Sequence, residues 1–505
     1  MNAARTPVIV GVGEVTQRGR VPADNLEPIA LMQAALAAAQ ADAGAPLVAQ
    51  IDSLDIVCEH SWPYEDAPAL LAQRLRIGPA HRAYAQAGGE SPLRLLHEAA
   101  LRIARGEAAV AAVVGAEASR TVAAAAKAGV ELPWTARDRN ARLLRGADIC
   151  HPVAVRHGVV APSTVYPFYE NACAAAWGQT PAQARDESAR LWAHCSEVAA
   201  RNPHAWQREP ASAADIASPG PANRFIAWPY TLRMVANPMV DMGAAVILTS
   251  LERARGLGLA EDRLVHVTGG AAASEPRDFL ARDGYTRSPA QEAVLEAALA
   301  LVDGDVKAFT ALELYSCFPV VPKMARRTLG LPADAAISVT GGLSFFGGPL
   351  NGYMAHAAAA AVRALRDTPA GGTALLYGQG EYVTKHHALV LAARAGAADR
   401  LSQDYGVQAS ADVRRGSPPP LVTTHVGAAA LETHTVVHDR EGAPSFAAVI
   451  ARTPGGARLM ARVDVQDADR AASLDRLTDF TAGAVGAHGR VAVGADGLLH
   501  WNFAT

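Results

Sequence analysis

The chain has 505 residues, a formal net charge of -3, 50% hydrophobic residues and 19% charged residues. This length exceeds what one hydrophobic core usually organises, so two or three domains are expected. The balanced charge provides no concentrated basic surface of the kind that nucleic acids and anionic membranes bind. The composition therefore favours a small molecule or another protein as the partner, and no nucleic acid.

Every apolar run is broken by Arg, Glu, Gly or Pro before it reaches the ~20 residues that cross a bilayer. We therefore expect no membrane span. The N-terminal run is glycine-punctuated and has no small-residue cleavage pattern, which predicts a first strand in a cytoplasmic protein. The cysteines have no CxxC pair and no tight Cys/His spacing, so neither a metal site nor a disulfide is expected; they are Cys58, Cys150, Cys173, Cys195 and Cys317.

The N-terminal part of the chain alternates between strand and helix patterns. Pro7–Gly13 predicts a buried strand, Pro28–Ala43 a helix ended by Gly44, and Asp52–Cys58 a second strand. Such alternation is typical of an α/β fold in which helices cover a buried sheet.

Two blocks of the sequence look alike. GGESPLRLLHEAALRIARGEAAVAAVVGAEAS begins at Gly88, and GGPLNGYMAHAAAAAVRALRDTPAGGTALLYGQGEY begins at Gly347. Each has a Gly-Gly turn, a proline near a helix start, an alanine-rich helix and an apolar strand. Each is also preceded by an apolar strand and a cysteine-bearing loop. An internal duplication is the simplest explanation, with halves at 5–260 and 261–398.

Residues 120–237 form an insertion in the first half, with a helix predicted at Pro181–Arg201. An insertion of this length usually serves function, so it is interpreted as a lid or ligand-binding region. After the SPPP linker, residues 418–505 predict a small all-β module, for which a barrel of the oligonucleotide/oligosaccharide-binding (OB) type is one interpretation. Its predicted strands are Thr433–His438, Ser445–Ala451 and Leu459–Val465.

The glycine-rich stretch from Thr340 to His356, TGGLSFFGGPLNGYMAH, resembles a loop of the thiolase superfamily. Thiolases have Gly-His-Pro-hydrophobic-Gly in this frame, and the segment beginning at Asn237 is similar to another of their loops. Residues 5–398 resemble the superfamily, and the whole chain resembles the thiolase-like protein type 1 group. The resemblance implies a duplicated, five-layered αβαβα fold with an additional C-terminal domain.

The same resemblance implies that the standard catalytic side chains are replaced. Gly89 stands where thiolases have the nucleophilic cysteine, and glycine cannot be acylated. Tyr315 replaces the Asn or His of the oxyanion hole, and Gly348 replaces the general-base histidine. The second cysteine corresponds to Tyr377 or Gly378, depending on one alignment gap. Standard thiolysis is therefore predicted to be very weak.

Five side chains are candidate catalytic replacements: Tyr315, Cys317, His356, Lys385 and His386. The Tyr315 phenol can donate a hydrogen bond to an oxyanion. His356 lies two helical turns after Gly348 and is interpreted either as a cavity base or as a hydrogen-bonded core residue. The basic pair could bind a phosphate of coenzyme A (CoA), supply a base, or make interdomain hydrogen bonds. The cysteine is either a nucleophile or a structural residue.

Another set of residues is assigned to substrate binding. Asn351 and Tyr353 follow the glycine loop, where exposed N–H groups favour a carbonyl oxygen or an anion, although capping and packing explain them equally well. The other candidates are Asn237, Ser316 and Gly347.

Three functions remain open from the sequence. The first is an acyl-CoA-handling enzyme of lipid metabolism that resembles acetyl-CoA acetyltransferase and has a non-standard active site. The second is an inactive binder of acyl-CoA or acyl carriers, and the third is a scaffold whose C-terminal domain binds a protein partner. A CoA thioester is the expected substrate or ligand, and no metal or bound cofactor is expected. Thiolases are commonly dimers, so a homodimer is expected, or a monomer if the extra domain covers the pairing edge.

Overall fold

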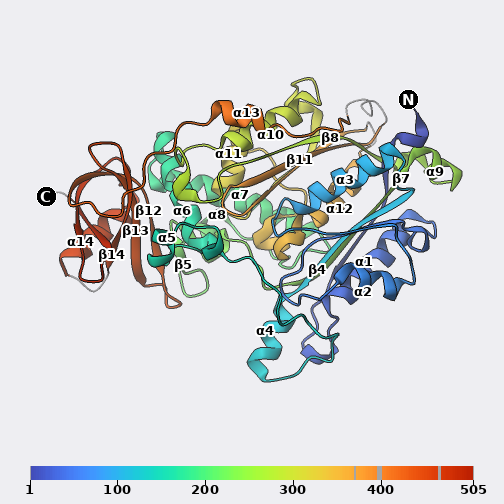
Figure 1. Cartoon of the computed structure of the whole chain (residues 1–505), viewed down its shortest axis with the longest axis horizontal. Helices are drawn as coiled ribbons and strands as arrows, with labels where there is room; N and C mark the ends of the chain where they lie inside the picture. Colours follow the sequence, from blue (N-terminus) through green and yellow to red (C-terminus); the bar gives the residue numbers. More distant parts are fainter. Residues whose placement is uncertain (1, 369–370, 395–400, 465–467, 504–505) are drawn as a thin grey trace.

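The structure of the chain is a computed structural model that describes residues 2–368, 371–394, 401–464 and 468–503. The predicted boundary at 398, the strand end at Val465 and the chain end at 505 lie outside these ranges. Figure 1 shows a large α/β body, with a β module at one end of its long axis. In the described part of the chain, no helix is long and apolar enough to cross a bilayer.

The first half of the body is built on a five-strand section of a nine-stranded sheet, in the order β3-β2-β4-β7-β1. Its parallel strands are β2, β3 and β4, while β7 pairs antiparallel with both β4 and β1. The elements are β1 (Pro7–Thr16), α1 (Pro28–Ala43), β2 (Ser53–Ile56), α2 (Ala67–Leu75), β3 (His81–Tyr84), α3 (Ser91–Arg105), β4 (Val110–Ala118), β7 (Asp241–Ser250) and α9 (Leu251–Gly256).

The second half repeats this arrangement. Its strands follow the order β8-β11-β10-β9, which corresponds to β1-β7-β4-β2 of the first half, and the two halves are joined through the pair β1–β8. The elements are β8 (Val265–Ser274), α10 (Pro289–Ala300), β9 (Phe309–Leu314), α11 (Val320–Thr328), α12 (Tyr353–Arg366), β10 (Thr373–Gly380), β11 (Lys385–Ala392) and α13 (Gln408–Arg414).

Helices α3 and α12 lie side by side in the middle of the body and pack against strands of both halves (Figure 1). Helix α1 covers the outer face of the first half, and α10 covers that of the second. All residues from Tyr353 to Val362 are buried, because α12 has protein on every side, and its run of alanines allows close packing there. The predicted αβαβα layering of a duplicated fold is confirmed.

Local sequence signals located several elements accurately. Helix α1 ends where predicted, with Gly44 in the left-handed region at φ 72°, a conformation that glycine adopts without strain. Helix α7 begins after Thr180, whose side chain accepts a hydrogen bond from the Gln183 backbone N–H in a capping box. The predicted helix at Pro181–Arg201 is therefore confirmed.

The insertion is mainly helical, and Figure 1 shows its first helix, α4, apart from α5–α8. Its elements are α4 (Ser119–Ala128), α5 (Pro152–Arg156), α6 (Pro162–Ala176), α7 (Pro181–Arg201), α8 (Ala213–Ala217), β5 (Phe225–Trp228) and β6 (Tyr230–Thr231). Strand β5 pairs with β12 of the C-terminal module, so the insertion and that module share one sheet.

The C-terminal module is a closed β-barrel. Its strands pair in the cyclic order β12-β13-β14-β16-β15-β12, with β14 and β16 parallel. This order, and a helix between the third and fourth strands that the sequence analysis did not predict, support the OB-like interpretation, which remains a prediction. The elements are β12 (Gly427–His438), β13 (Pro444–Arg452), β14 (Arg458–Asp464), α14 (Ala468–Leu477), β15 (His488–Val493) and β16 (Leu499–Phe503).

Candidate functional site

A cavity of about 460 Å³ lies where the glycine turns before α3 and α12 meet the insertion. The sequence placed the catalytic positions of the thiolase resemblance on separate loops, and three of them line this one cavity: Gly89, Tyr315 and Gly348. The duplicated glycine turns therefore open onto a shared space. The other lining residues are His60, Ala87, Gly88, Leu144, Arg145, Gly146, Ile149, Pro162, Ser163, Tyr166, Val235, Ala236, Pro238, Cys317, Phe318, Leu343, Leu350, Asn351, Gln379, Gly380, Glu381 and Tyr382.

The Tyr315 side chain occupies the space that a nucleophile at position 89 would need. A Cβ atom built on Gly89 would lie 1.8 Å from the Tyr315 hydroxyl oxygen and 2.5 Å from the Gln379 carbonyl oxygen. Atoms do not approach this closely in a packed interior. A side chain at position 89 and the observed position of the Tyr315 ring are therefore mutually exclusive.

Position 348 differs from position 89. A Cβ built on Gly348 would have its nearest neighbours, which include the Asn237 carbonyl oxygen, at 3.5 Å, an ordinary van der Waals distance. The backbone and packing would accept a Cβ atom there. Crowding at the first side-chain atom therefore does not require glycine at this position.

Tyr315 has an unusual backbone and an unpaired hydroxyl. Its φ is 35°, a left-handed conformation that costs energy for a residue with a Cβ and is typical of functional sites. Its hydroxyl has no hydrogen-bond partner among the described residues. Burial raises the pKa of the phenol well above its usual value. The group is therefore a neutral donor at physiological pH.

Cys317 also lines the cavity, but its environment does not activate it. Burial raises the pKa of this thiol to about 12, and the Gln379 side-chain amide donates a hydrogen bond to its sulfur at 3.1 Å. Since the thiolate is the nucleophilic form, the thiol is unreactive near neutral pH.

A carboxyl group that the sequence analysis did not single out lies next to the cavity. Glu90 is buried, and its Oε2 has no hydrogen-bond partner among the described residues. This oxygen packs closely against two glycines that line the cavity. A Cβ built on Gly88 would lie 2.2 Å from it, and a Cβ built on Gly380 would lie 2.1 Å from it. Burial raises the pKa of Glu90 to about 7, and the Lys385 charge opposes that rise. The sequence signal that could have identified Glu90 was its position directly after Gly89.

His356 lies outside the set of cavity-lining residues. Its Nδ1 is 2.7 Å from Glu14 Oε1 in a buried pair that Arg363 also joins. Burial opposes ionisation of Glu14, but the hydrogen bond from His356 and the two positive charges outweigh it and lower the Glu14 pKa to about 2. The arrangement corresponds to the hydrogen-bonded core interpretation of this histidine.

The basic pair at the start of β11 lies behind the cavity wall. The Lys385 ammonium donates to the Ala87 carbonyl oxygen at 3.0 Å and pairs with Glu381 at the same distance. His386 is buried, 2.7 Å from the Tyr377 hydroxyl, and burial lowers its pKa to about 4. Tyr377 itself is not among the lining residues. Lys385 thus contacts residues of the wall, while His386 belongs to the core.

Of the predicted substrate-binding residues, Asn351 lines the cavity. Its side chain accepts from the Gly88 N–H and donates to the Cys58 carbonyl oxygen, both at 2.9 Å, and thereby joins loops of the two halves. Tyr353 is buried, and its hydroxyl donates to Glu313 at 2.8 Å. The other three predicted substrate-binding residues contact the loops around the cavity but do not line it: Asn237, Ser316 and Gly347.

Several lining residues carried no recognisable motif. Tyr166 comes from α6 of the insertion, and its hydroxyl donates to the Glu381 carbonyl oxygen at 2.9 Å. Gln379 lies near the end of β10, within the YGQG stretch that follows Leu376. Only the packing of the insertion against both halves brings these residues together.

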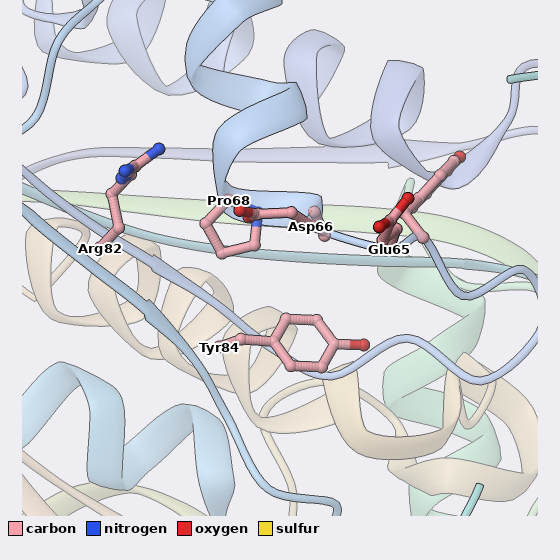
Figure 2. A pocket seen from close by; sticks show the side chains of 7 residues that line it. Glu65, Asp66, Pro68, Arg82 and Tyr84 are labelled. Carbon is pink, nitrogen blue, oxygen red and sulfur yellow. The ribbon is translucent and has the colours of Figure 1, made fainter. Parts of the chain in front are cut away.

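A second pocket, of about 330 Å³, opens between edge strand β3 and the start of α2 (Figure 2). Figure 2 shows Arg82 and Tyr84 of the strand with Asp66 and Pro68 of the helix start. None of the positions that the thiolase resemblance assigns to catalysis lines it, so the cavity of about 460 Å³ remains the candidate active site. The described residues contain no group of three or more His, Cys, Asp or Glu side chains placed to hold a metal ion.

Comparisons with known proteins agree with this geometry. Residues 410–497 match the family model of the thiolase-like protein type 1 additional C-terminal domain. The chain is similar to a monomeric SCP2-thiolase-like protein type 1 from Mycobacterium smegmatis, with 28% identity, a TM-score of 0.82 and coverage of 99% of both chains. No curated protein matches the sequence.

More distant structures share the fold of the body. Human mitochondrial 3-ketoacyl-CoA thiolase in complex with CoA is 15% identical, with a TM-score of 0.56 and coverage of 78% of this chain and 99% of that one. The Ltp2–ChsH2(DUF35) aldolase is 20% identical, with a TM-score of 0.59 and coverage of 78% and 100%. The chain therefore has a thiolase-like fold related to acetyl-CoA acetyltransferases and SCP2-thiolase-like proteins, and it carries the additional C-terminal domain. The resemblance drawn from the sequence is confirmed.

Proposed function

We propose that this protein binds an acyl-CoA thioester in the cavity and acts on it without forming an acyl-enzyme. The observation that carries the proposal is the Tyr315 hydroxyl in the space of the missing nucleophile at Gly89. An unpaired, neutral donor in a mainly apolar cavity is suited to bind a thioester carbonyl oxygen. Cys317, the thiol that lines the cavity, is held in its unreactive form.

Acid–base chemistry is the type of reaction that these groups support. Glu90, with a pKa of about 7, would accept the proton from the carbon next to the thioester carbonyl. The electron pair of the broken C–H bond would move to the thioester oxygen as an enolate, whose negative charge the Tyr315 hydroxyl would stabilise. The carboxyl has an unpaired oxygen beside Gly88 and Gly380, which line the cavity. This mechanism replaces the acetyl transfer of acetyl-CoA acetyltransferase, which needs a cysteine nucleophile.

The second candidate is a binder of acyl-CoA without turnover. It is favoured by the absence of a nucleophile, since the cavity would retain its shape and its carbonyl-binding donor. We also propose a monomer in place of the homodimer expected from the sequence, because the relative with full-length coverage is described as monomeric. A molar mass measured by light scattering tests that proposal.

The test is to incubate the purified protein with acyl-, 3-ketoacyl- and 3-hydroxyacyl-CoA thioesters and to follow both products and intact protein mass. The proposal expects product without a covalent adduct, and loss of turnover in Tyr315→Phe. An acylated protein would refute the non-covalent mechanism. Binding without product from any thioester would favour the second candidate, and no binding at all would reject both.

A further inference from the structure

Two buried histidines that the proposed function does not use contact each other between α3 and β11. His97 Nδ1 and His387 Nε2 are 3.1 Å apart, and both residues are at most 1% exposed. A hydrogen bond between these two atoms uses one proton and one lone pair. The outer nitrogens, His97 Nε2 and His387 Nδ1, have no hydrogen-bond partner among the described residues. In the neutral pair, one outer nitrogen is therefore an unsatisfied N–H donor and the other an unsatisfied lone pair.

The ring of Tyr405 packs against both imidazoles. Its centre lies 4.4 Å from that of His97 and 5.3 Å from that of His387. The Tyr405 hydroxyl donates to Glu98 Oε1 at 3.1 Å, and Arg94 pairs with the same carboxylate and compensates its charge. Tyr405 is partly exposed, so its ring lies between the buried pair and solvent. Movement of this ring would admit water to the outer nitrogens.

Tyr405 belongs to residues 401–407, which we call the strap and which lead into α13. Two backbone hydrogen bonds among the described residues join the strap to β8. The Ala272 N–H donates to the Tyr405 carbonyl oxygen, and the Val407 N–H donates to the Ala272 carbonyl oxygen, both at 2.9 Å. Four of the seven strap residues are exposed. A segment with few buried contacts opens at a lower free energy than the core, so the strap is suited to detach while the body stays folded.

The surroundings of the histidine pair disfavour a positive charge. Burial lowers the pKa of His97 to about 4, and burial, His97 and the Arg94 charge lower the pKa of His387 well below its usual value. The cross-strand neighbours of His387 are uncharged, namely Ala272 on β8 and Gly378 on β10. In contact with water, an imidazole has a pKa of ~6.5. Opening of the strap therefore raises the proton affinity of both histidines.

We propose that the His97–His387 pair is an acid-sensitive latch, in which proton uptake by the pair releases the strap from β8 and exposes the surface beneath Tyr405. The open form binds protons more tightly than the closed form, so closure is favoured above ~pH 6.5 and is lost as the pH falls toward 4. Helix α3 begins directly after Glu90, and β11 begins at Lys385. The latch therefore lies on two elements whose ends reach the candidate site, but it does not depend on the proposed function.

Hydrogen–deuterium exchange of the wild-type chain at pH 7 and pH 5 tests the latch, with each rate divided by the intrinsic rate at that pH. The reporting amides are those of Ala272 and Val407, which donate the bonds between the strap and β8. For one histidine, a pKa of ~6.5 in the open form against about 4 in the closed form should reduce their protection about twentyfold between pH 7 and pH 5. Helix α4 contains no histidine, so its protection should not change.

Three variants identify the groups responsible. The double variant His97→Gln/His387→Gln should lose most of the pH dependence of the strap amides. His266→Gln is the matched control, because His266 is another buried histidine of β8 with a lowered pKa, and this variant should keep the wild-type change. Tyr405→Ala should reduce the protection of the strap amides at both pH values, since it removes the ring that covers the pair.

Equal protection of the strap amides at pH 5 and pH 7 in wild type overturns the proposal. So does an equal fall in α4, because acid would then loosen the surface in general. A fall that persists in the folded double variant assigns the response to other groups and also overturns the latch. The wild-type comparison needs no variant, so it remains decisive if the double variant does not fold.

Discussion

The close approach of Tyr315 to Gly89 leads to a sharp prediction for Gly89→Ala. The new Cβ would start 1.8 Å from the tyrosine hydroxyl oxygen, so the ring must move by more than ~1 Å before the contact becomes tolerable. The Gln379 carbonyl oxygen, 2.5 Å away, belongs to the backbone of β10 and cannot rotate aside. Overpacking of this kind costs about 1–3 kcal/mol of unfolding free energy, and the backbone contact places the expected value at the upper end.

The assay is urea unfolding followed by tryptophan fluorescence, with Gly348→Ala as the matched control. That control should change the unfolding free energy by less than about 0.5 kcal/mol, because its Cβ meets only ordinary contacts at 3.5 Å. Gly89→Ala should cost less in a Tyr315→Ala background than in wild type, but it should still cost something, since the Gln379 oxygen remains. Equal stability of the two alanine variants, or no coupling between positions 89 and 315, would refute the reasoning.

Three further predictions concern buried titratable groups. His386 has a folded pKa of about 4 against ~6.5 unfolded, so the unfolded chain binds the proton first as pH falls. Its stabilisation is therefore present above ~pH 6.5 and lost toward pH 4. Between pH 7 and pH 5, the unfolding free energy of His386→Gln should fall by about 2 kcal/mol less than that of wild type, as measured by urea unfolding. An equal fall in both proteins would contradict this prediction. Iodoacetamide at pH 8 should leave Cys317 unmodified in the native protein, because the pKa of this thiol is about 12. Protein unfolded in urea should be labelled at Cys317, and peptide mass spectrometry measures the labelling in both states. Rapid labelling of the native protein would show an activated thiol. His356→Ala should lower the unfolding free energy by about 3–5 kcal/mol, since it leaves the buried Glu14 with one partner fewer. The same variant should bind octanoyl-CoA with unchanged affinity. A large loss of affinity in the folded variant would give this histidine a role in the cavity.

Local signals in the sequence were sufficient for much of the fold. The helix at Pro28–Ala43 and the capped helix at Pro181–Arg201 were predicted with the observed bounds, because their ends are defined by proline, glycine and capping residues within a few positions. The repeated Gly-Gly blocks indicated two similar halves. Helix α14 was not predicted, since its short polar pattern lies between strands and tertiary packing outweighs weak propensity.

The sequence by itself determined that positions 89 and 348 carry no side chain, because glycine at a position is a matter of residue identity. Only the tertiary structure decided what surrounds these two positions. Glu14 and His356 are 342 positions apart and form a pair that no local pattern reveals. The Tyr315 hydroxyl beside Gly89 likewise depends on the packing of one half against the other. Side-chain proximity in a duplicated fold is set by long-range packing, which short-range spacing does not encode.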